Sequence, residues 1–374
     1  MRIVNVASRL DDYGVETVVV HPTQDAARLT RKLNQAEISH RGLRLHRLTK
    51  HVPTLLKYIA FWGPEIARIR RVLAERKIDL VHCNGAWQVK GMIASYLAGI
   101  PAIWHLNDTY MPLPVRKMFG AIAPWAANGF ILSCKRTRNY YLHGAKLQNK
   151  PSKVIHPPVD TEEFDPHQVE PDKKIDGYDG LTVVTVATIN SIKRLEDFVD
   201  VAHRICSTLQ KEIQFFIVGP IYESQRDYGR QLKARAKERG CDSIHFTGRS
   251  ESVPSILKAS DLYVCTSQSE SGPISVWEAM SMGIPVVSTD VGDVHQFLER
   301  DDAPAGAVVN VGDVEGLARQ ILRFLRDRGL RVRAGENARK VACAELDLNV
   351  CAKKHATFYR SVSENCQSFV QSDN

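Results

Sequence analysis

The sequence predicts an α/β fold built from two doubly wound parallel-sheet domains that face each other across a cleft. Short β-branched apolar runs alternate with longer segments of helical periodicity along the whole chain, as in βαβ units. The chain has 374 residues, which is longer than one hydrophobic core usually grows. A segment rich in Pro, Asp and Glu, residues 156–180, separates the two halves and is expected to be a linker with a loop. We therefore expect domains at 1–158 and 159–348, and a C-terminal helix with a frayed tail at 349–374.

The strands of the first half begin with "RIVNVA", residues 2–7, which leads into a charged turn. The next run, "GVETVV", is either the remnant of a helix or a strand, and its consecutive valines favour the strand. Further strands are predicted at 79–83, 101–105, 129–134 and 152–156.

Residues 52–76, "VPTLLKYIAFWGPEIARIRRVLAER", combine an apolar aromatic section with Arg68, Arg70, Arg71 and Arg76. This combination is typical of a peripheral membrane-binding element. An ordinary amphipathic core helix has the same pattern, so both interpretations stay open.

The strands of the second half are equally regular. They are predicted at 181–187, 213–219, 243–248, 261–267, 284–289 and 306–311. The last helix is predicted over 349–362, and the polar residues after it are expected to fray.

Charge is distributed unevenly along the chain. Residues 1–158 contain 24 Lys and Arg against 9 Asp and Glu, a net charge of +15, whereas residues 159–374 contain 26 against 33, a net charge of −7. The first half is therefore expected to meet something anionic, such as a membrane surface.

The eight cysteines are at least eight positions apart, so they form no CxxC spacing for zinc or redox chemistry. Reduced thiols in a cytoplasmic protein are the simplest interpretation. No secretory signal is evident at residues 1–12, and no stretch reaches the roughly 18 apolar residues of a spanning helix.

Two glutamates mark the best candidate site, in "ESGPISVWE", residues 270–278. Glu270 falls just past the carboxyl end of a predicted strand, and Pro273 suits the first turn of the helix that follows. Glu278 falls inside that helix, which Gly283 and Pro285 should end. Ligands of open α/β sheets bind at the carboxyl ends of strands, and a helix start favours an anionic group such as phosphate.

The segment "SESGPISVWEAMSMGIPVVSTDVGDV" resembles the donor-binding segment of retaining GT-B glycosyltransferases of family 4, with its E-x7-E motif. "IHPPVDTEEF", "FFIVGP", "IHFTGR" and "ILKASDLYVCTSQSESG" follow in the order expected for that family. The resemblance implies a GT-B fold with two Rossmann-like domains and a nucleotide diphosphate sugar as donor substrate. It implies no requirement for a metal ion or another cofactor.

The resemblance also implies roles for individual residues. Glu278 would accept hydrogen bonds from the nucleotide ribose, Glu270 would contact the transferred sugar, and Lys193 would neutralise the donor diphosphate. His105, at the end of a first-domain strand, matches a histidine that reaches the reaction centre. The remaining residues assigned to the donor pocket are Gly272, Pro273, Ile274, Ser275, Thr188, Arg194 and Gly219.

Two features depart from the family pattern. The family usually has an arginine five residues before the lysine, where this chain has Thr188, and the neighbouring Arg194 is the candidate substitute. The family also begins with a strand, a Gly-rich loop, a helix and a second strand. Residues 1–22 contain one glycine, Gly14, and have no room for both the helix and the second strand.

The main hypothesis is a retaining transferase that moves a sugar to a glycan or lipid-linked acceptor in cell-surface polysaccharide or glycolipid synthesis. It would work in the cytoplasm, peripheral on the inner face of the cytoplasmic membrane. The alternative is a catalytically impaired nucleotide-sugar-binding or scaffold homologue. A nucleic-acid binder would explain the basic first half but neither glutamate, and a nucleotide-sugar epimerase fits the E-x7-E segment less well.

Overall fold

The computed structural model describes residues 2–46, 52–142, 149–209 and 212–372. The chain divides into two compact units. The first unit contains residues 1–156 and 348–374, and the second contains residues 157–347. Both are α/β units with parallel sheets, which confirms the predicted fold class.

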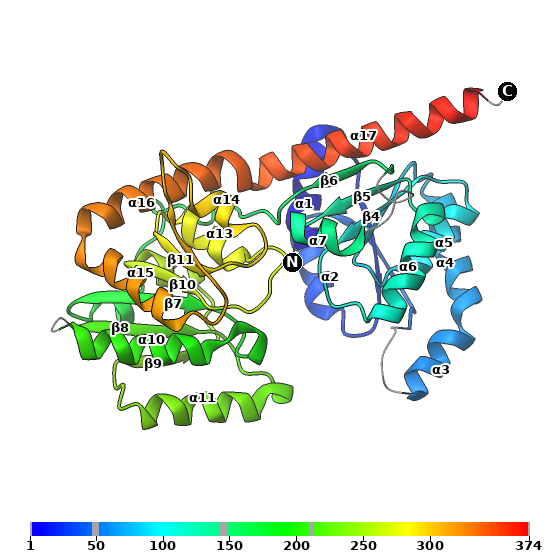
Figure 1. The fold of residues 1–374 in the computed structure, drawn as a ribbon. Coiled ribbons are helices and arrows are strands. Elements are labelled where there is room, and N and C mark those ends of the chain that lie inside the picture. The colour runs from blue at the N-terminus through cyan, green and yellow to red at the C-terminus, as the bar shows by residue number, and fades with distance from the viewer. Residues whose placement is uncertain (1, 47–51, 143–148, 210–211, 373–374) are drawn as a thin grey trace. The chain divides into compact units, whose positions relative to one another are not determined.

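The second unit is built on a six-stranded sheet of order β12-β11-β10-β7-β8-β9 (Figure 1). Every pairing in it is parallel. All six strands predicted for this half are present: β7 (Leu181–Val186), β8 (Ile213–Val218), β9 (Ile244–Gly248), β10 (Leu262–Cys265), β11 (Val286–Thr289) and β12 (Gly306–Val309).

Both faces of this sheet are buried. Along β10, Leu262 and Val264 belong to one hydrophobic core, whereas Tyr263 and Cys265 belong to the other. Because successive side chains of a strand point to opposite faces, a strand that is covered on both sides must be apolar throughout. The helices and turns of this unit are α9 (Lys173–Asp176), η2 (Ser191–Lys193), α10 (Leu195–Thr208), η3 (Glu223–Gln225), α11 (Arg226–Glu238), α12 (Val253–Lys258), α13 (Ile274–Ser281), α14 (Val294–Leu298), α15 (Val314–Arg326), α16 (Arg328–Val341) and the π-helical η4 (Ala342–Leu346).

The segment predicted as a linker with a loop, residues 156–180, packs against the second unit. Val159 forms a β-bridge with Asp347, and Phe164 is buried in the core beneath α13. The carbonyl of Phe164 accepts hydrogen bonds from Ser281 Oγ at 2.8 Å and from Arg339 Nη1 at 2.7 Å. These contacts fix the segment on its own unit.

The first unit contains two separate parallel sheets. One has the order β1-β2, and the other has the order β3-β4-β5-β6. The strands are β1 (Val18–Pro22), β2 (Ser39–Leu43), β3 (Val81–Asn84), β4 (Ala102–Leu106), β5 (Gly129–Leu132) and β6 (Ser152–Val154). The prediction of a strand at "GVETVV" is therefore confirmed by β1, and β2 was not predicted because "SHRGL" is short and polar.

The prediction of a first strand at residues 2–7 is wrong, because Arg2–Leu10 form helix α1. The expectation that residues 1–22 have no room for both a helix and a strand is also wrong, because α1 and β1 both lie there. Val4 and Ala7 are buried in one core, and Val6 and Leu10 in another, so the residues that share a core are three or four positions apart, which is a helical period. The other helices of this unit are η1 (Asp11–Tyr13), α2 (Ala27–Gln35), α3 (Val52–Ala60), α4 (Trp62–Glu75), α5 (Val89–Leu97), α6 (Leu113–Ala126), α7 (Lys135–Tyr141) and α17 (Leu348–Ser372).

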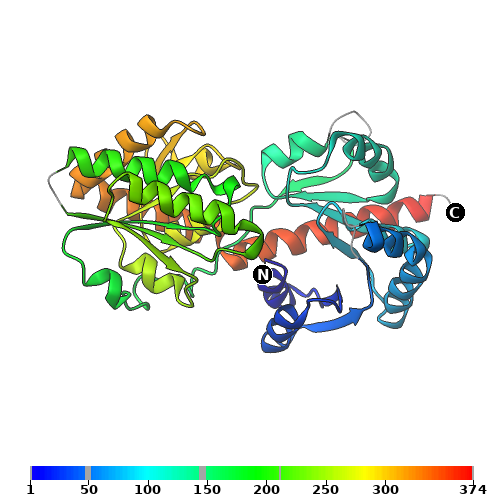
Figure 2. The same cartoon turned by 90° about the horizontal axis from the view of Figure 1, so that it is seen from below.

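Helix α17 returns the chain to the first unit and runs along it (Figures 1 and 2). Phe358 and Val362 of α17 share a hydrophobic core with Ile103 and Ile131 of the sheet. Gly129 permits this close approach, since a Cβ atom there would lie 2.9 Å from a methyl group of Val362. None of the described helices is long and apolar enough to cross a lipid bilayer.

A cluster of rings joins α17 to strands β3 and β4. His82 Nδ1 lies 2.5 Å from the hydroxyl of Tyr359, and His82 Nε2 lies 3.0 Å from His105 Nδ1. The ring of His355 lies 5.8 Å from that of His82, measured between centroids. Removal from water lowers the pKa of His82 to about 4, so this imidazole is neutral at pH 7.

The His82 ring should make the fold sensitive to acid. Since the unfolded chain binds this proton near pH 6.5 and the folded chain only near pH 4, stability is lost as the pH falls through that window. Between pH 7.5 and 5, wild type should lose roughly 1 to 2 kcal/mol more unfolding free energy than His82→Gln. Urea unfolding at the two pH values checks this, and equal losses would contradict it.

Candidate functional site

The predicted site residues of the second unit gather at the carboxyl ends of neighbouring strands. The sheet order places β7 beside β10, with β8 and β9 on one side and β11 and β12 on the other. The strand order therefore reverses between β7 and β10. Open α/β sheets bind ligands at such a reversal. Thr188 follows β7, Gly219 follows β8, and Glu270 follows β10.

Lys193 and Glu270 form an ion pair, with Lys193 Nζ against Glu270 Oε1. Their side chains are 25% and 17% exposed, so the pair is partly shielded from water but still accessible to a ligand. Ser267 Oγ donates a second hydrogen bond to Glu270 Oε1 at 3.0 Å. The structure thus brings together two residues that lie 77 positions apart in the sequence.

Backbone contacts hold the loops that carry this pair. Thr266 Oγ1 donates to the carbonyl of Lys193 at 2.8 Å, and the Gln268 N–H donates to the carbonyl of Ile192 at 2.7 Å. Thr289 Oγ1, at the end of β11, donates to the carbonyl of Ser267 at 2.7 Å. The turn after β7 and the loop after β10 are therefore fixed to each other and to β11.

Helix α13 begins at Ile274, directly after Pro273, and ends before Gly283, which confirms the helix predicted here. Its first N–H groups have no acceptor within the helix, and they carry the positive end of the helix dipole. Ser275 Oγ accepts a hydrogen bond from the buried Tyr263 hydroxyl at 2.8 Å, which holds the first turn against β10. Gly272 is buried immediately before this helix start.

Glu278 is partly buried within α13. Burial raises the pKa of its carboxyl group to about 7, and the negative charge of Glu163 adds to the effect. A carboxyl group that burial keeps close to half-protonated at neutral pH is a feature of functional sites rather than of solvated surfaces.

Arg194, the suggested substitute for the missing family arginine, is held by another residue. Its Nε and Nη2 donate to the two carboxylate oxygens of the buried Asp197 at 2.7 and 3.0 Å. Arg194 also has a left-handed backbone, with φ of 45°. The guanidinium is therefore engaged at the start of α10, whereas the neighbouring Lys193 pairs with Glu270.

The backbone conformation and the close packing at position 219 require a glycine. Its φ is 154°, and a Cβ atom would lie 1.9 Å from the carbonyl oxygen of Ala187. Any side chain here would push apart the turns after β7 and β8. Thr188, next to Ala187, lies partly buried at this close approach.

His105, the predicted catalytic histidine of the first domain, lies within β4 and is 5% exposed. Its imidazole contacts His82 and the ring of His355, as part of the cluster beneath α17. The structure therefore places this side chain in the interior of the first unit.

Three other polar side chains meet at the carboxyl ends of β3, β4 and β5. Asn107 Nδ2 donates to Asn84 Oδ1 at 2.5 Å, and Ser133 Oγ donates to Asn107 Oδ1 at 3.2 Å. Sequence reasoning missed this cluster. Its signal was a polar residue directly after each apolar run, at positions that parallel strands bring to one edge.

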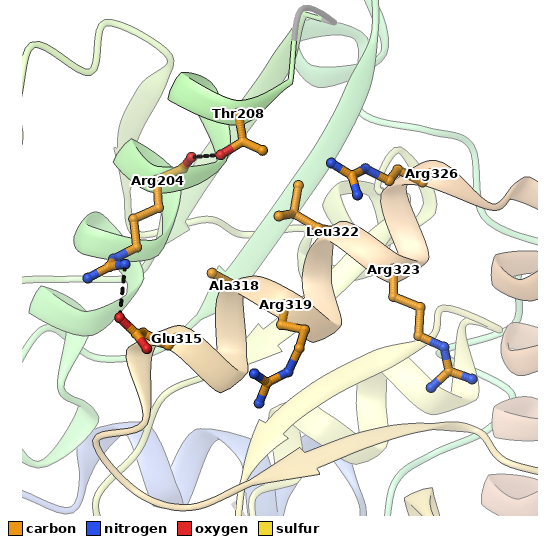
Figure 3. A pocket seen from close by; sticks show the side chains of 8 residues that line it. All are labelled: Arg204, Thr208, Glu315, Ala318, Arg319, Leu322, Arg323 and Arg326. Atoms are coloured by element: carbon orange, nitrogen blue, oxygen red, sulfur yellow. Dashed lines mark hydrogen bonds and ion pairs between the residues drawn. The ribbon is translucent and has the colours of Figure 1, made fainter.

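A hollow of about 660 Å³ lies between α10 and α15, away from the carboxyl ends of the strands (Figure 3). It contains none of the predicted site residues. The side chains that line it are Arg204, Thr208, Glu315, Ala318, Arg319, Leu322, Arg323 and Arg326. Within the described ranges, no three His, Cys, Asp or Glu side chains are grouped so that they could hold a metal ion.

Two family profiles match the chain, one over each half. Glycosyltransferase Family 4 matches residues 1–163, and Glycosyl transferases group 1 matches residues 170–341. The chain belongs to the family 4 glycosyltransferases. This assignment confirms the family that the E-x7-E segment indicated.

This glycosyltransferase is similar to curated bacterial enzymes. N-acetyl-alpha-D-glucosaminyl L-malate synthase of Bacillus anthracis is 25% identical over 180 residues, which is 48% of this chain and 45% of that protein. UDP-Gal:alpha-D-GlcNAc-diphosphoundecaprenol alpha-1,3-galactosyltransferase of Escherichia coli is 26% identical over 301 residues, covering 75% of this chain and 76% of that protein.

Solved structures confirm the GT-B fold of this glycosyltransferase. Anabaena Alr3699/HepE, crystallised in complex with UDP, superposes with a TM-score of 0.80 at 19% identity. The superposition covers 96% of this chain and 95% of that chain.

In the ligand-free glycosyltransferase, the ionised Glu278 should lower the free energy of unfolding. Because its folded pKa is raised from 4.5 to about 7, its ionisation opposes folding increasingly above pH 4.5 and to the full extent above pH 7. Glu278→Gln should therefore be more stable than wild type at pH 8 by roughly 1 to 3 kcal/mol, and equal to it near pH 4.5. Thermal unfolding measures this, with the exposed Glu251→Gln as control. A less stable Glu278→Gln at pH 8 would contradict the assignment.

Proposed function

We propose that this protein is a retaining hexosyltransferase that moves a sugar from a nucleotide diphosphate sugar to a glycan or lipid-linked acceptor. The products would be cell-surface polysaccharides or glycolipids. The observation that carries the proposal is the Lys193–Glu270 ion pair beside the start of α13, with the partly buried Glu278 in the same helix. The galactosyltransferase of Escherichia coli, which is named for a diphosphoundecaprenol-linked acceptor, supports the acceptor class.

The donor would bind with its diphosphate at the start of α13. The N–H groups there and the Lys193 ammonium both favour anionic oxygens. Glu278 would accept hydrogen bonds from the ribose hydroxyls, and Glu270 would contact the sugar. The complex of Anabaena Alr3699/HepE, which has the same fold, with UDP supports the binding of a nucleotide here.

The transfer itself would take place on one face of the sugar. The acceptor oxygen forms a bond to the anomeric carbon while the bond from that carbon to the donor phosphate oxygen breaks, and the hydroxyl proton passes to the departing phosphate oxygen. Lys193 and the helix start stabilise the charge that develops on the leaving diphosphate. Glu270 holds the lysine in position, so that the ammonium is ordered before the donor arrives.

The acceptor and the anionic membrane surface are assigned to the basic first unit. Leu56 and Ile59 of α3 are 61% and 63% exposed, which is unusual for large apolar side chains. A position on the inner face of the cytoplasmic membrane would give such a surface access to lipid-linked acceptors. The competing function is a nucleotide-sugar-binding homologue without catalysis, and detectable sugar transfer or donor hydrolysis excludes it.

Nucleotide binding should strengthen as the pH rises from 6 to 8. The carboxylate form of Glu278 accepts hydrogen bonds from ribose, and its pKa near 7 leaves it mostly protonated at pH 6. Calorimetry with UDP, GDP and ADP should identify the base. With that nucleotide, wild type should gain about tenfold in affinity across this range beyond any gain shown by Glu278→Gln. Identical pH profiles would contradict the ribose assignment.

Lys193→Met should remove most of the transfer activity. Loss of the cation beside the leaving diphosphate should reduce kcat by about 100-fold or more. Lys258→Met, which changes an exposed lysine at the end of α12, is the matched control and should retain activity. Activity of Lys193→Met within a few-fold of wild type would overturn the assigned role.

A further inference from the structure

Helix α6 has an unusual composition for a helix at the surface of an α/β unit. Its sequence, "LPVRKMFGAIAPWA", contains two charged residues, Arg116 and Lys117, and no acidic residue. The face that packs against the unit is formed by Phe119 and Ala123, which are buried. A surface helix normally carries charged residues on the face that points to solvent. A helix that is apolar on all sides is instead covered by other apolar groups, of a protein or of a membrane.

The outward face of α6 is an apolar stripe. Met118, Ile122 and Trp125, spaced by four and three residues, are 58%, 40% and 74% exposed. Helical geometry places them on one side. Tyr96 and Leu97, at the end of the neighbouring helix α5, are 66% and 51% exposed. Large apolar side chains exposed together in this way mark an interaction surface.

The surroundings of the stripe are basic. Helices α6 and α7 together contain five Lys and Arg and no Asp or Glu. Helix α7 contacts α6 through Phe119 and Tyr141, whose ring centroids lie 5.2 Å apart, and its sequence "KRTRNYY" begins with basic residues. Arg116 lies over the ring of Tyr140 at 4.4 Å from the centroid, so its charge lies against α7.

The segment predicted from the sequence as a membrane element, 52–76, differs from α6. Within it, α4 buries Ile66, Ile69 and Leu73. Its Glu65 is also buried and accepts a hydrogen bond from Lys90 Nζ of α5 at 2.5 Å. Helix α4 is therefore the ordinary amphipathic core helix that the sequence left open, and in this segment the exposed apolar residues lie in α3 and at the start of α4.

We propose that the outward face of α6 docks on an anionic lipid bilayer. Met118, Ile122 and Trp125 would enter the interfacial region, while Lys117 and the basic residues of α7 would contact lipid phosphates. This inference deepens the proposed function, on which it rests for the lipid-linked acceptor. Charge complementarity selects this occupant, because α6 and α7 contain basic residues and no acidic ones, and a second copy of the chain would bring the same two basic helices against them.

The test is co-sedimentation with vesicles of phosphatidylglycerol and phosphatidylethanolamine, compared with vesicles of phosphatidylcholine alone. Wild type should bind the anionic vesicles, and binding should fall at least tenfold at high salt or on neutral vesicles. The double variant Met118→Ser/Trp125→Ser should lose at least tenfold in partitioning. The control Tyr222→Ser/Val332→Ser removes two apolar residues that are 53% and 51% exposed on the second unit, and should bind as wild type does.

Two outcomes would overturn the docking surface. One is equal vesicle binding by the α6 variant and the control. The other is a dimer, measured by light scattering, that the α6 variant abolishes, since a second copy would then cover this face. Nucleotide binding by calorimetry separates this inference from the proposed function. If the α6 variant binds the nucleotide and wild type does not bind vesicles, only the docking surface fails.

Discussion

The ion pair between Lys193 and Glu270 is the contact on which the candidate site depends. It joins the turn after β7 to the loop after β10, at the point where the order of the strands reverses. Thr266 and Gln268 tie the same two segments through the backbone, so the ammonium is positioned by the fold rather than by its own flexible stem. A group ordered in advance stabilises charge in a reaction without further reorganisation.

Glu278 shows what this arrangement costs in stability. Its carboxyl group is removed from water and repelled by Glu163, and its raised pKa records both effects. An uncharged residue at this position of α13 would avoid this cost, because burial and Glu163 both disfavour the ionised carboxyl group. Retention of a carboxyl group against this penalty is consistent with a ligand that supplies hydrogen-bond donors.

The sequence predicted the parts of the structure that depend on local pattern. All six strands of the second unit and the start and end of α13 followed from apolar runs and from Pro and Gly positions. Arg2–Leu10 was assigned wrongly because a short apolar run fits a strand and a helix equally well until its buried partners are known. The interior position of His105 and the Asn84–Asn107 contact depend on strand register and on the return of α17, which no local pattern encodes.

Hydrogen exchange with and without a nucleotide sugar tests the central claim most directly, because it reports where the donor binds. Bound donor should slow the exchange of the N–H groups of Gly272, Ile274 and Ser275 and of the turn at 188–193, where the helix start and the Lys193 turn meet the diphosphate. Protection at the arginine-lined hollow between α10 and α15, with no change at Gly272, Ile274 and Ser275, would contradict donor binding beside the Lys193–Glu270 pair.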